Sequence, residues 1–182
     1  MEQRPAARAA REAWAWLQTV TAVLVAAVLV FVFVGQPVVV DGNSMLPTLR
    51  DRELMLVRRL GYDPQPGDVV VLRKAFRDVT GPIVKRIIAV EGQRVEIDYA
   101  AGTVSVDGTV LTEDYILEPM VQQSWQSITT LTVPEGCVFV MGDNRNISDD
   151  SRDGALGAVE EGCLLGKVEL VLFPFQNFGG IS

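Results

Sequence analysis

The feature that most constrains the fold of this 182-residue chain is a long apolar run near its N-terminus. No charged residue occurs from Ala13 to Val40, and residues 13–34 are mostly alanine, valine, leucine and phenylalanine. A helix that crosses the hydrocarbon core of a bilayer needs about 20 such residues. Residues 13–34 are therefore predicted to be a transmembrane anchor.

The residues around this run predict its orientation. Three arginines precede it and two tryptophans begin it: Arg4, Arg8, Arg11, Trp14 and Trp16. Positively charged flanks stay in the cytoplasm and tryptophans favour the membrane interface, so residues 1–12 are predicted to be cytoplasmic. Residues 35–182 then form an extracytoplasmic domain, held at the cell membrane by a single pass.

Two alternative interpretations of the run are disfavoured. A cleaved secretory signal would have a shorter apolar core, followed by small residues three apart, and no such pair follows this run. A buried core helix would show a polar stripe, and the run has none.

Short apolar runs follow the predicted anchor. Glycine, proline and aspartate separate them at intervals too short for crossover helices, which is typical of an antiparallel all-β domain. The runs cover residues 36–40, 54–57, 69–72, 83–90, 94–97, 104–106, 110–111, 128–133, 138–141 and 164–173. Asp107-Gly108 lies between two of them and predicts a hairpin turn. The predicted fold class is therefore mainly β, with an N-terminal transmembrane helix before an antiparallel β-sheet domain and a small insertion at residues 98–130.

Composition excludes several kinds of chemistry. The chain has no histidine, which rules out Ser-His-Asp and Cys-His catalysis and histidine-bearing metal sites. Its two cysteines, Cys137 and Cys163, are too few for a four-cysteine zinc site, and form either a disulfide or two buried thiols. Neither a cofactor nor a metal is expected. A net charge of −7 argues against nucleic acid as a partner. A hydrolase of this composition must take its base from lysine, aspartate, glutamate or tyrosine.

Ser44 is the first candidate for chemistry. It lies in the segment Gly-Asn-Ser-Met-Leu-Pro-Thr-Leu at residues 42–49, between two apolar runs. Glycine, asparagine and proline favour a sharp bend in the backbone, so the Ser44 hydroxyl can face a ligand at the end of an apolar groove. A polar turn between two strands is the alternative interpretation.

Lys85 is the second candidate, because it interrupts the otherwise strongly apolar run 83–90. Strand alternation places Lys85 and Arg86 on opposite faces, so one of the two cations points toward packed protein. A desolvated lysine loses its proton readily and becomes a usable general base. The alternative is a lysine at a sheet edge, with its stem buried and its ammonium in water.

The third candidate is the polar segment 141–154, which comes directly after the apolar run 138–141. It is dense in hydrogen-bonding side chains, which is typical of a solvated loop. A calcium loop of the EF-hand type is disfavoured because the acidic alternation fails at Arg145 and Ile147 supplies no side-chain acceptor.

Taken in order, these segments resemble bacterial type I signal peptidases, the membrane-bound Ser/Lys proteases that remove signal peptides from exported proteins. Residues 44–49 match the serine box of that family, and residues 67–71 resemble the next box. Residues 84–92 resemble the lysine box, and residues 142–152 the last box. The single predicted anchor and the small size are more similar to the Gram-positive type than to the two-anchor Gram-negative type.

The resemblance implies a β-sheet catalytic domain of the signal-peptidase type and a role for each matched residue. Ser44 would be the nucleophile, and neutral Lys85 the general base that takes its proton. Ser148 would orient the lysine. Two ion pairs would support the site: Asp143 with Arg86, and Asp150 with Arg152.

The resemblance also implies an oxyanion hole and a substrate pocket. Some family members have a serine two residues before the nucleophile, where this chain has Gly42. The oxyanion donor is therefore expected to be the Ser44 backbone N–H, with Gly42 contributing at most its own N–H. An extended signal peptide would place its two small residues in shallow apolar pockets on one face. The pocket candidates, which are also ordinary core residue types, are Val40, Met45, Val84 and Leu49.

The predicted function is the removal of signal peptides from exported preproteins by a membrane-anchored serine endopeptidase, with preproteins and the lipid bilayer as partners. One alternative is a self-cleaving Ser/Lys protease related to the SOS repressors, although those carry an N-terminal DNA-binding domain in place of an anchor. The other is a non-catalytic, membrane-tethered peptide-binding β-domain. Such a domain would need neither Ser44 nor Lys85.

Overall fold

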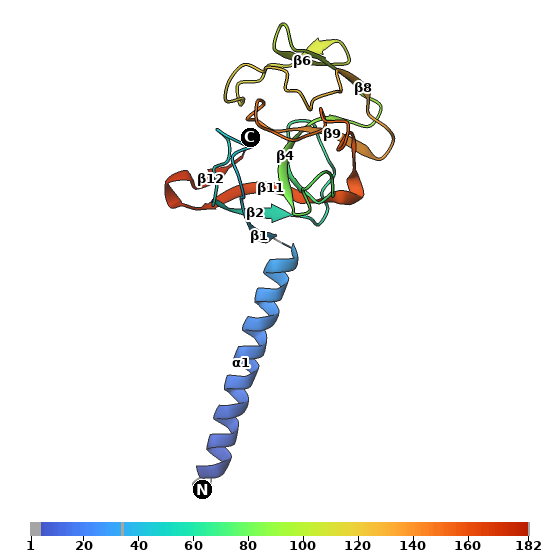
Figure 1. Ribbon diagram of the computed structural model, residues 1–182. Coiled ribbons are helices and arrows are strands. Elements are labelled where there is room, and N and C mark those ends of the chain that lie inside the picture. The colour runs from blue at the N-terminus through green and yellow to red at the C-terminus, as the bar shows by residue number, and fades with distance from the viewer. Residues whose placement is uncertain (1–4, 34, 182) are drawn as a thin grey trace. The chain divides into compact units, whose positions relative to one another are not determined.

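The computed structural model describes residues 5–33 and 35–181, which form two units, Met1–Gln36 and Pro37–Ser182 (Figure 1). Residues 1–4 of the predicted cytoplasmic segment and Val34, the end of the predicted anchor, lie outside the described residues. Each unit is considered by itself below.

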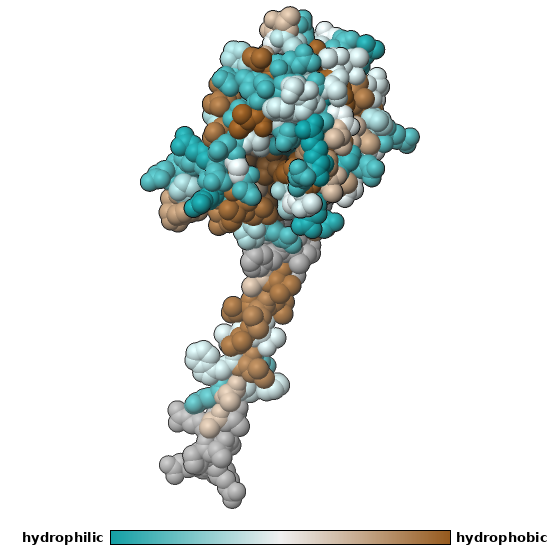
Figure 2. All heavy atoms as spheres, in the orientation of Figure 1, coloured by the Kyte–Doolittle hydropathy of each residue, from teal (hydrophilic) through white to brown (hydrophobic). Residues whose placement is uncertain are grey.

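The first unit is a single helix, α1 (Pro5–Phe33). It begins at a proline, which fits the first turn of a helix because its missing N–H would have no partner there. Apolar residues gather along its length (Figure 2), and its described side chains, Trp14 and Trp16 among them, are exposed. Among the described residues, no helix reaches the combined length and hydropathy expected of a membrane span. The anchor at residues 13–34 therefore stays a prediction.

The second unit is mainly β, as predicted. Its larger sheet has the spatial order β1-β2-β11-β3-β4-β9-β10, with β12 beside β11. The strands are β1 (Gln36–Val39), β2 (Leu54–Arg58), β3 (Val69–Leu72), β4 (Ile83–Val90), β9 (Cys137–Met141), β10 (Val159–Glu160), β11 (Leu164–Phe173) and β12 (Gly179–Gly180). The pairs that involve β3, β4, β9 and β11 are antiparallel. Short 3₁₀ turns, η1 (Glu161–Cys163) and η2 (Phe175–Asn177), precede and follow β11.

A smaller antiparallel sheet is formed by strands within and at the ends of the predicted insertion. Its order is β7-β6-β5-β8, with β5 (Arg94–Asp98), β6 (Thr103–Val106), β7 (Thr109–Val110) and β8 (Thr130–Thr132). The hairpin at Asp107-Gly108 is confirmed, since Val106 pairs with Thr109 across it. Both turn residues have positive φ, 51° and 77°, as a two-residue hairpin requires.

The core explains why β4 can hold two charged residues. Val69 and Val71 of β3 pack into one apolar cluster and Val70 and Leu72 into another, so both faces of the sheet are covered here. Val70 lies opposite Lys85 and Val69 opposite Arg86, and directly opposed residues share a face. Each cation of β4 therefore enters a packed layer, one on each side of the sheet.

Two strands were missed by the sequence prediction. β10 and β12 have two residues each, which is too short for a period-2 pattern to appear. The predicted runs otherwise correspond to observed strands, with ends that differ by one or two residues.

Candidate active site

Ser44 lies in a loop whose base is closed by the main chain. The Val40 N–H donates to the Glu53 carbonyl at 2.8 Å, and the Arg52 N–H donates to the Val40 carbonyl at 3.0 Å. Met45 and Leu49 are fully buried and fix the loop in the core. These contacts hold the loop in place, and Ser44 remains partly exposed on it.

Lys85 reaches this loop from the middle of β4. Lys85 is 3% exposed and Arg86 is 2% exposed. The sequence predicted that only one of them would point toward packed protein, whereas both do. The reason is that the sheet is covered on both faces, a property that alternation within one strand does not show.

The side chains of Lys85 and Ser44 are in contact, with Nζ 2.7 Å from Oγ. Burial lowers the pKa of Lys85 from 10.5 to about 8. The carboxylates of Asp150 and Asp149 act in the opposite direction, and burial outweighs them. A neutral amine beside a hydroxyl can accept the hydroxyl proton, which is the arrangement that activates a weak oxygen nucleophile.

The loop after β9 is attached directly to the serine loop. The Asn144 N–H donates to the Ser44 carbonyl at 3.0 Å, and its side-chain amide donates to the Asn43 carbonyl at 3.2 Å. Gly142 lies so close that a Cβ atom there would be 2.5 Å from the Ser44 carbonyl oxygen. The two loops therefore form one rigid body around the dyad.

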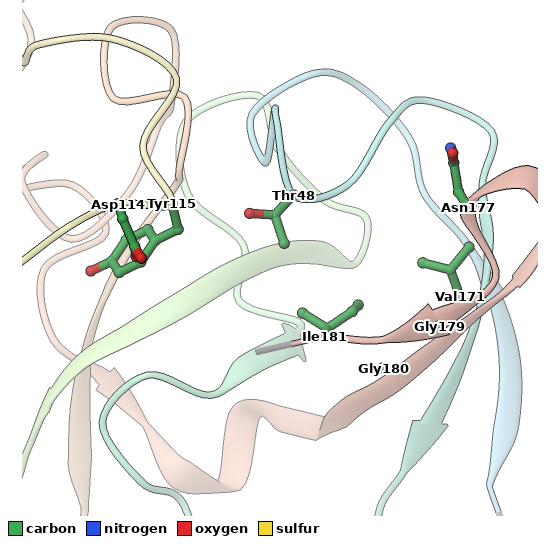
Figure 3. A pocket seen from close by; sticks show the side chains of 8 residues that line it. All are labelled: Thr48, Asp114, Tyr115, Val171, Asn177, Gly179, Gly180 and Ile181. Carbon is green, nitrogen blue, oxygen red and sulfur yellow. The ribbon is translucent and has the colours of Figure 1, made fainter.

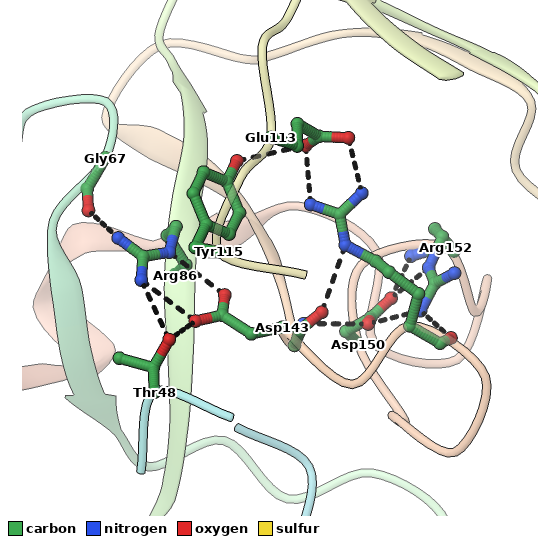
Figure 4. A network of polar contacts seen from close by, with 10 residues as sticks. Thr48, Gly67, Arg86, Glu113, Tyr115, Asp143, Asp150 and Arg152 are labelled. Atoms are coloured by element: carbon green, nitrogen blue, oxygen red, sulfur yellow. Dashed lines mark hydrogen bonds and ion pairs between the residues drawn. The ribbon is translucent and has the colours of Figure 1, made fainter. Parts of the chain in front are cut away.

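The predicted pair of Arg86 and Asp143 is present and fully buried (Figure 4). Two guanidinium nitrogens donate to the carboxylate at 2.9 and 2.8 Å, and a third donates to the Gly67 carbonyl at 2.8 Å. The Thr48 hydroxyl donates to Asp143 at 2.5 Å, which links the serine loop to this pair. The guanidinium carbon of Arg86 also lies 4.1 Å from the centre of the Tyr115 ring.

The predicted pair of Asp150 and Arg152 is present as well, with contacts of 2.8 and 2.7 Å. Burial disfavours the charged carboxylate, but the Arg152 guanidinium and the Gly142 N–H hold the pKa of Asp150 below its ordinary value. Arg152 also donates to the Arg145 carbonyl at 2.7 Å. This pair therefore fixes both ends of the polar loop.

Sequence reasoning missed a third buried pair. Two Arg145 nitrogens donate to the Glu113 carboxylate at 2.9 and 2.6 Å, and a third donates to the Gly142 carbonyl at 3.1 Å. The Tyr115 hydroxyl donates to the same carboxylate at 3.0 Å. Glu113 and Tyr115 come from the segment after β7, which has no periodicity in sequence, so no local signal pointed to them.

Two residues with predicted roles, Ser148 and Gly42, have hydrogen-bonding surroundings that differ from those expected. The Ser148 hydroxyl is buried, and no described residue forms a hydrogen bond with it, so the predicted contact with the lysine amine is not formed here. The Gly42 N–H donates to the Asp51 carboxylate at 2.9 Å, so Gly42 is already engaged and is not free to be an oxyanion donor. No described residue accepts a hydrogen bond from the Ser44 N–H.

The predicted pocket residues do not line the cavity at Ser44. All four are buried in one core cluster: Val40, Met45, Leu49 and Val84. The cavity, of about 210 Å³, is instead lined by Ser44, Lys85, Phe76, Val79, Ile83 and Ile147, among others. Pocket and core residues have the same apolar character, so the substrate-pocket role of these four residues stays a prediction.

A second cavity, of about 350 Å³, lies on another side of the serine loop (Figure 3). Thr48 and Tyr115 line it together with Ile181 near the C-terminus.

The sequence left open whether the two cysteines form a disulfide. Cys137 and Cys163 are free thiols in the structure, so they form no disulfide with each other.

The chain is similar in sequence to known proteins of one family. The sequence model of the family "Signal peptidase, peptidase S26" matches residues 13–173. A probable signal peptidase I-1 from Synechocystis is 37% identical over 168 residues, which cover 87% of this chain and 82% of the relative. Signal peptidase IB from Staphylococcus aureus is 32% identical over 182 residues, which cover 89% and 92%. A crystal structure of a signal peptidase I from Enterococcus faecalis has 30% identity and a TM-score of 0.47, and covers 58% of this chain and 97% of its own.

The chain therefore belongs to the signal peptidase family, peptidase S26, and is a serine endopeptidase. The resemblance predicted from the sequence boxes is confirmed.

Proposed function

We propose that this protein removes N-terminal signal peptides from exported preproteins, with Ser44 as nucleophile and Lys85 as general base. The observation that carries the proposal is the 2.7 Å contact between Nζ and Oγ in a setting where the lysine is buried. The names of its relatives, signal peptidase I-1 and signal peptidase IB, support the choice of substrate.

The reaction follows from the positions of the two side chains. Neutral Lys85 takes the Ser44 proton as Oγ attacks the scissile carbonyl. The resulting ammonium returns a proton to the leaving amine, and an acyl-enzyme forms. Lys85, again neutral, then activates the water that hydrolyses the ester and frees Ser44.

The oxyanion and the ammonium each need a partner during this cycle. We assign the Ser44 N–H to the oxyanion, because its hydrogen is not used by any described residue. One such donor is worth about 2.7–4 kcal/mol of the barrier in related chemistry. We assign the Ser148 hydroxyl to the ammonium, since this buried oxygen has no other partner among the described residues.

We further propose that residues 13–34 anchor the protein in the cell membrane by a single pass. Support comes from the uncharged run and from the arginines before it, which favour a cytoplasmic N-terminus. Residues 35–182 would then act outside the cytoplasm, where exported preproteins emerge. The lipid bilayer is thus the second partner, and a small single-anchor enzyme resembles the Gram-positive type.

Cleavage in trans tests the function. The full-length protein in detergent should cut a purified preprotein once, directly after a small residue, as determined by mass spectrometry of the products. Ser44→Ala should leave the same preprotein intact. Cleavage by this variant, or self-cleavage in place of cleavage in trans, would contradict the proposal.

The pH dependence of kcat/KM should follow the loss of a proton from Lys85. Because the pKa of Lys85 is about 8, roughly one tenth of the enzyme has a neutral amine at pH 7 and nine tenths at pH 9. We expect kcat/KM to rise about tenfold between these pH values and to fall further below pH 7. A profile that is flat from pH 5 to 9 would exclude a lysine base with this pKa.

A further inference from the structure

The carboxylate of Glu53 lies at the base of the serine loop and has no cationic partner. Glu53 is 3% exposed, and it takes part in none of the ion pairs that the described residues form. One of its carboxylate oxygens accepts a hydrogen bond from the Arg50 N–H at 3.0 Å. A buried carboxylate without a cation depends on hydrogen-bond donors, because an unpaired oxygen costs free energy. Glu53 therefore needs a second donor.

The second donor comes from the C-terminal segment. The side-chain amide of Asn177 donates to the other carboxylate oxygen of Glu53, across 124 positions of sequence. Asn177 is the last residue of η2, which contains no buried residue. Phe175 and Phe178, on either side of it, are 80% and 61% exposed. Apolar packing therefore contributes little to the position of this turn, and the hydrogen bond to Glu53 is a specific contact with the serine loop.

The residues after η2 also return toward the serine loop. β12 pairs with β11 in antiparallel fashion, which turns the chain back along the sheet. Ile181 then packs against the apolar cluster that contains Met45 and Leu49. It also lines the second cavity together with Thr48 (Figure 3). The C-terminal segment, residues 174–181, is thus bound to the loop at its base and faces it across this cavity.

The base of the loop is the place where this contact can affect Ser44. The Glu53 carbonyl accepts from the Val40 N–H and closes the loop, while the Asn144 N–H holds the Ser44 carbonyl. The loop is therefore fixed at two places, and a shift of Glu53 moves one of them. A displacement of about 1 Å at a catalytic group can cost 10²-fold in rate.

We infer that Asn177 is a positioning residue that holds the serine loop in its active geometry through Glu53. This inference rests on the proposed function, in which Ser44 is the nucleophile. It gives the C-terminal segment a part in the reaction, although the matched sequence boxes end at residue 152. Loss of the contact should lower kcat, because the Ser44 Oγ then moves relative to the Lys85 Nζ. It should leave KM nearly unchanged, because Asn177 does not line the cavity beside Ser44.

The test reverses the direction of the hydrogen bond in the full-length enzyme in detergent. Asn177→Asp replaces the amide donor by a second carboxylate, which repels that of Glu53. We expect kcat on a preprotein to fall about 10²-fold, with KM within about twofold of the wild type. Glu53→Gln, added to this variant, supplies an amide that donates to the new carboxylate, while its oxygen still accepts the Arg50 N–H. The double variant should regain kcat to within about threefold of the wild type.

Gln176→Glu is the matched control. It makes the same change of charge at the neighbouring exposed residue of η2, so it should keep the wild-type kcat. Asn177→Ala removes the donor without adding a charge and should lower kcat about tenfold. This variant decides the question if Asn177→Asp has no cooperative thermal transition.

Wild-type kcat in both single variants of Asn177 would overturn the inference and leave the proposed function standing. A loss of activity in Asn177→Asp that Glu53→Gln does not relieve, or one that appears only in KM, would overturn it too. A wild-type enzyme that does not cut the preprotein would instead contradict the proposed function.

Discussion

Replacement of Lys85 by methionine should abolish activity and make the protein more stable. Methionine has a similar length but no amine, so Ser44 loses the group that accepts its proton. Loss of a general base lowers rates by about 10²–10⁴-fold, and we expect the upper end because the chain has no histidine to substitute. Activity on a preprotein should therefore be near the limit of detection.

The gain in stability follows from the pKa of Lys85, which falls from 10.5 to about 8 because the amine is buried. Between these pH values the unfolded chain binds a proton that the folded protein does not, so the stability of the wild type rises with pH in this window. Below pH 8 the full difference opposes folding, about 3 kcal/mol at 1.36 kcal/mol for each pH unit. Loss of the contact with Ser44 costs about 1 kcal/mol. The net gain at pH 7 is then about 2 kcal/mol.

Thermal unfolding of the full-length protein at two pH values measures this effect. A gain of about 2 kcal/mol raises Tm by about 4–8 °C in a protein of this size. The difference between Lys85→Met and wild type should shrink above pH 8 and reach zero at about pH 10, below 10.5, because the cost of the lost Ser44 contact does not depend on the lysine's proton. Lys167→Met is the matched control, because Lys167 pairs with Asp68 and lies partly exposed, away from the dyad. A variant that is equally inactive but less stable than wild type at pH 7 would contradict a strongly desolvated lysine.

Gly142→Ala should cause the second large loss, although it adds a single methyl group. The added Cβ would be 2.5 Å from the Ser44 carbonyl oxygen and still closer to the Ser148 hydroxyl. The Ser44 carbonyl cannot move freely, because the Asn144 N–H holds it. The loop must therefore shift, and a displacement of about 1 Å at a catalytic group can cost 10²-fold in rate. We expect kcat to fall by about that factor, with a smaller change in KM.

Gly162→Ala is the control for this change. Gly162 has no atom within 4 Å of a Cβ at its position, so the methyl group fits without displacement and activity should be retained. Gly142 does not have the positive φ that would strain an alanine, so the comparison isolates the steric effect. Wild-type kinetics in Gly142→Ala would show that the two loops are not the rigid body described here.

The sheet was largely predictable from the sequence because its strands are apolar runs bounded by turn residues. The ion pairs of Arg86 and Arg152 followed from the resemblance, since their partners lie in matched boxes. Glu113 could not be found in this way. It lies in an aperiodic segment, and its partner Arg145 is 32 residues away.

The residues that line the cavity beside Ser44 were missed for a different reason. Val40 and Phe76 are both apolar and both buried, and only the packing decides that one faces the core and the other the cavity. Burial of Lys85 was likewise open on the sequence, where the strand pattern alone favoured a position at a sheet edge. Alternation describes one strand, whereas desolvation depends on what covers the sheet.

A measurement of the Lys85 pKa is the most direct test of the proposed Ser44–Lys85 dyad. The chain contains three lysines, Lys74, Lys85 and Lys167, so protein labelled with ¹³C at the lysine ε-carbon gives three signals. The signal that is absent from Lys85→Met belongs to Lys85. We predict that in the full-length wild-type protein this signal titrates near pH 8. A titration near the ordinary value of 10.5 would mean that the amine is charged at neutral pH, and Lys85 could not be the base that activates Ser44.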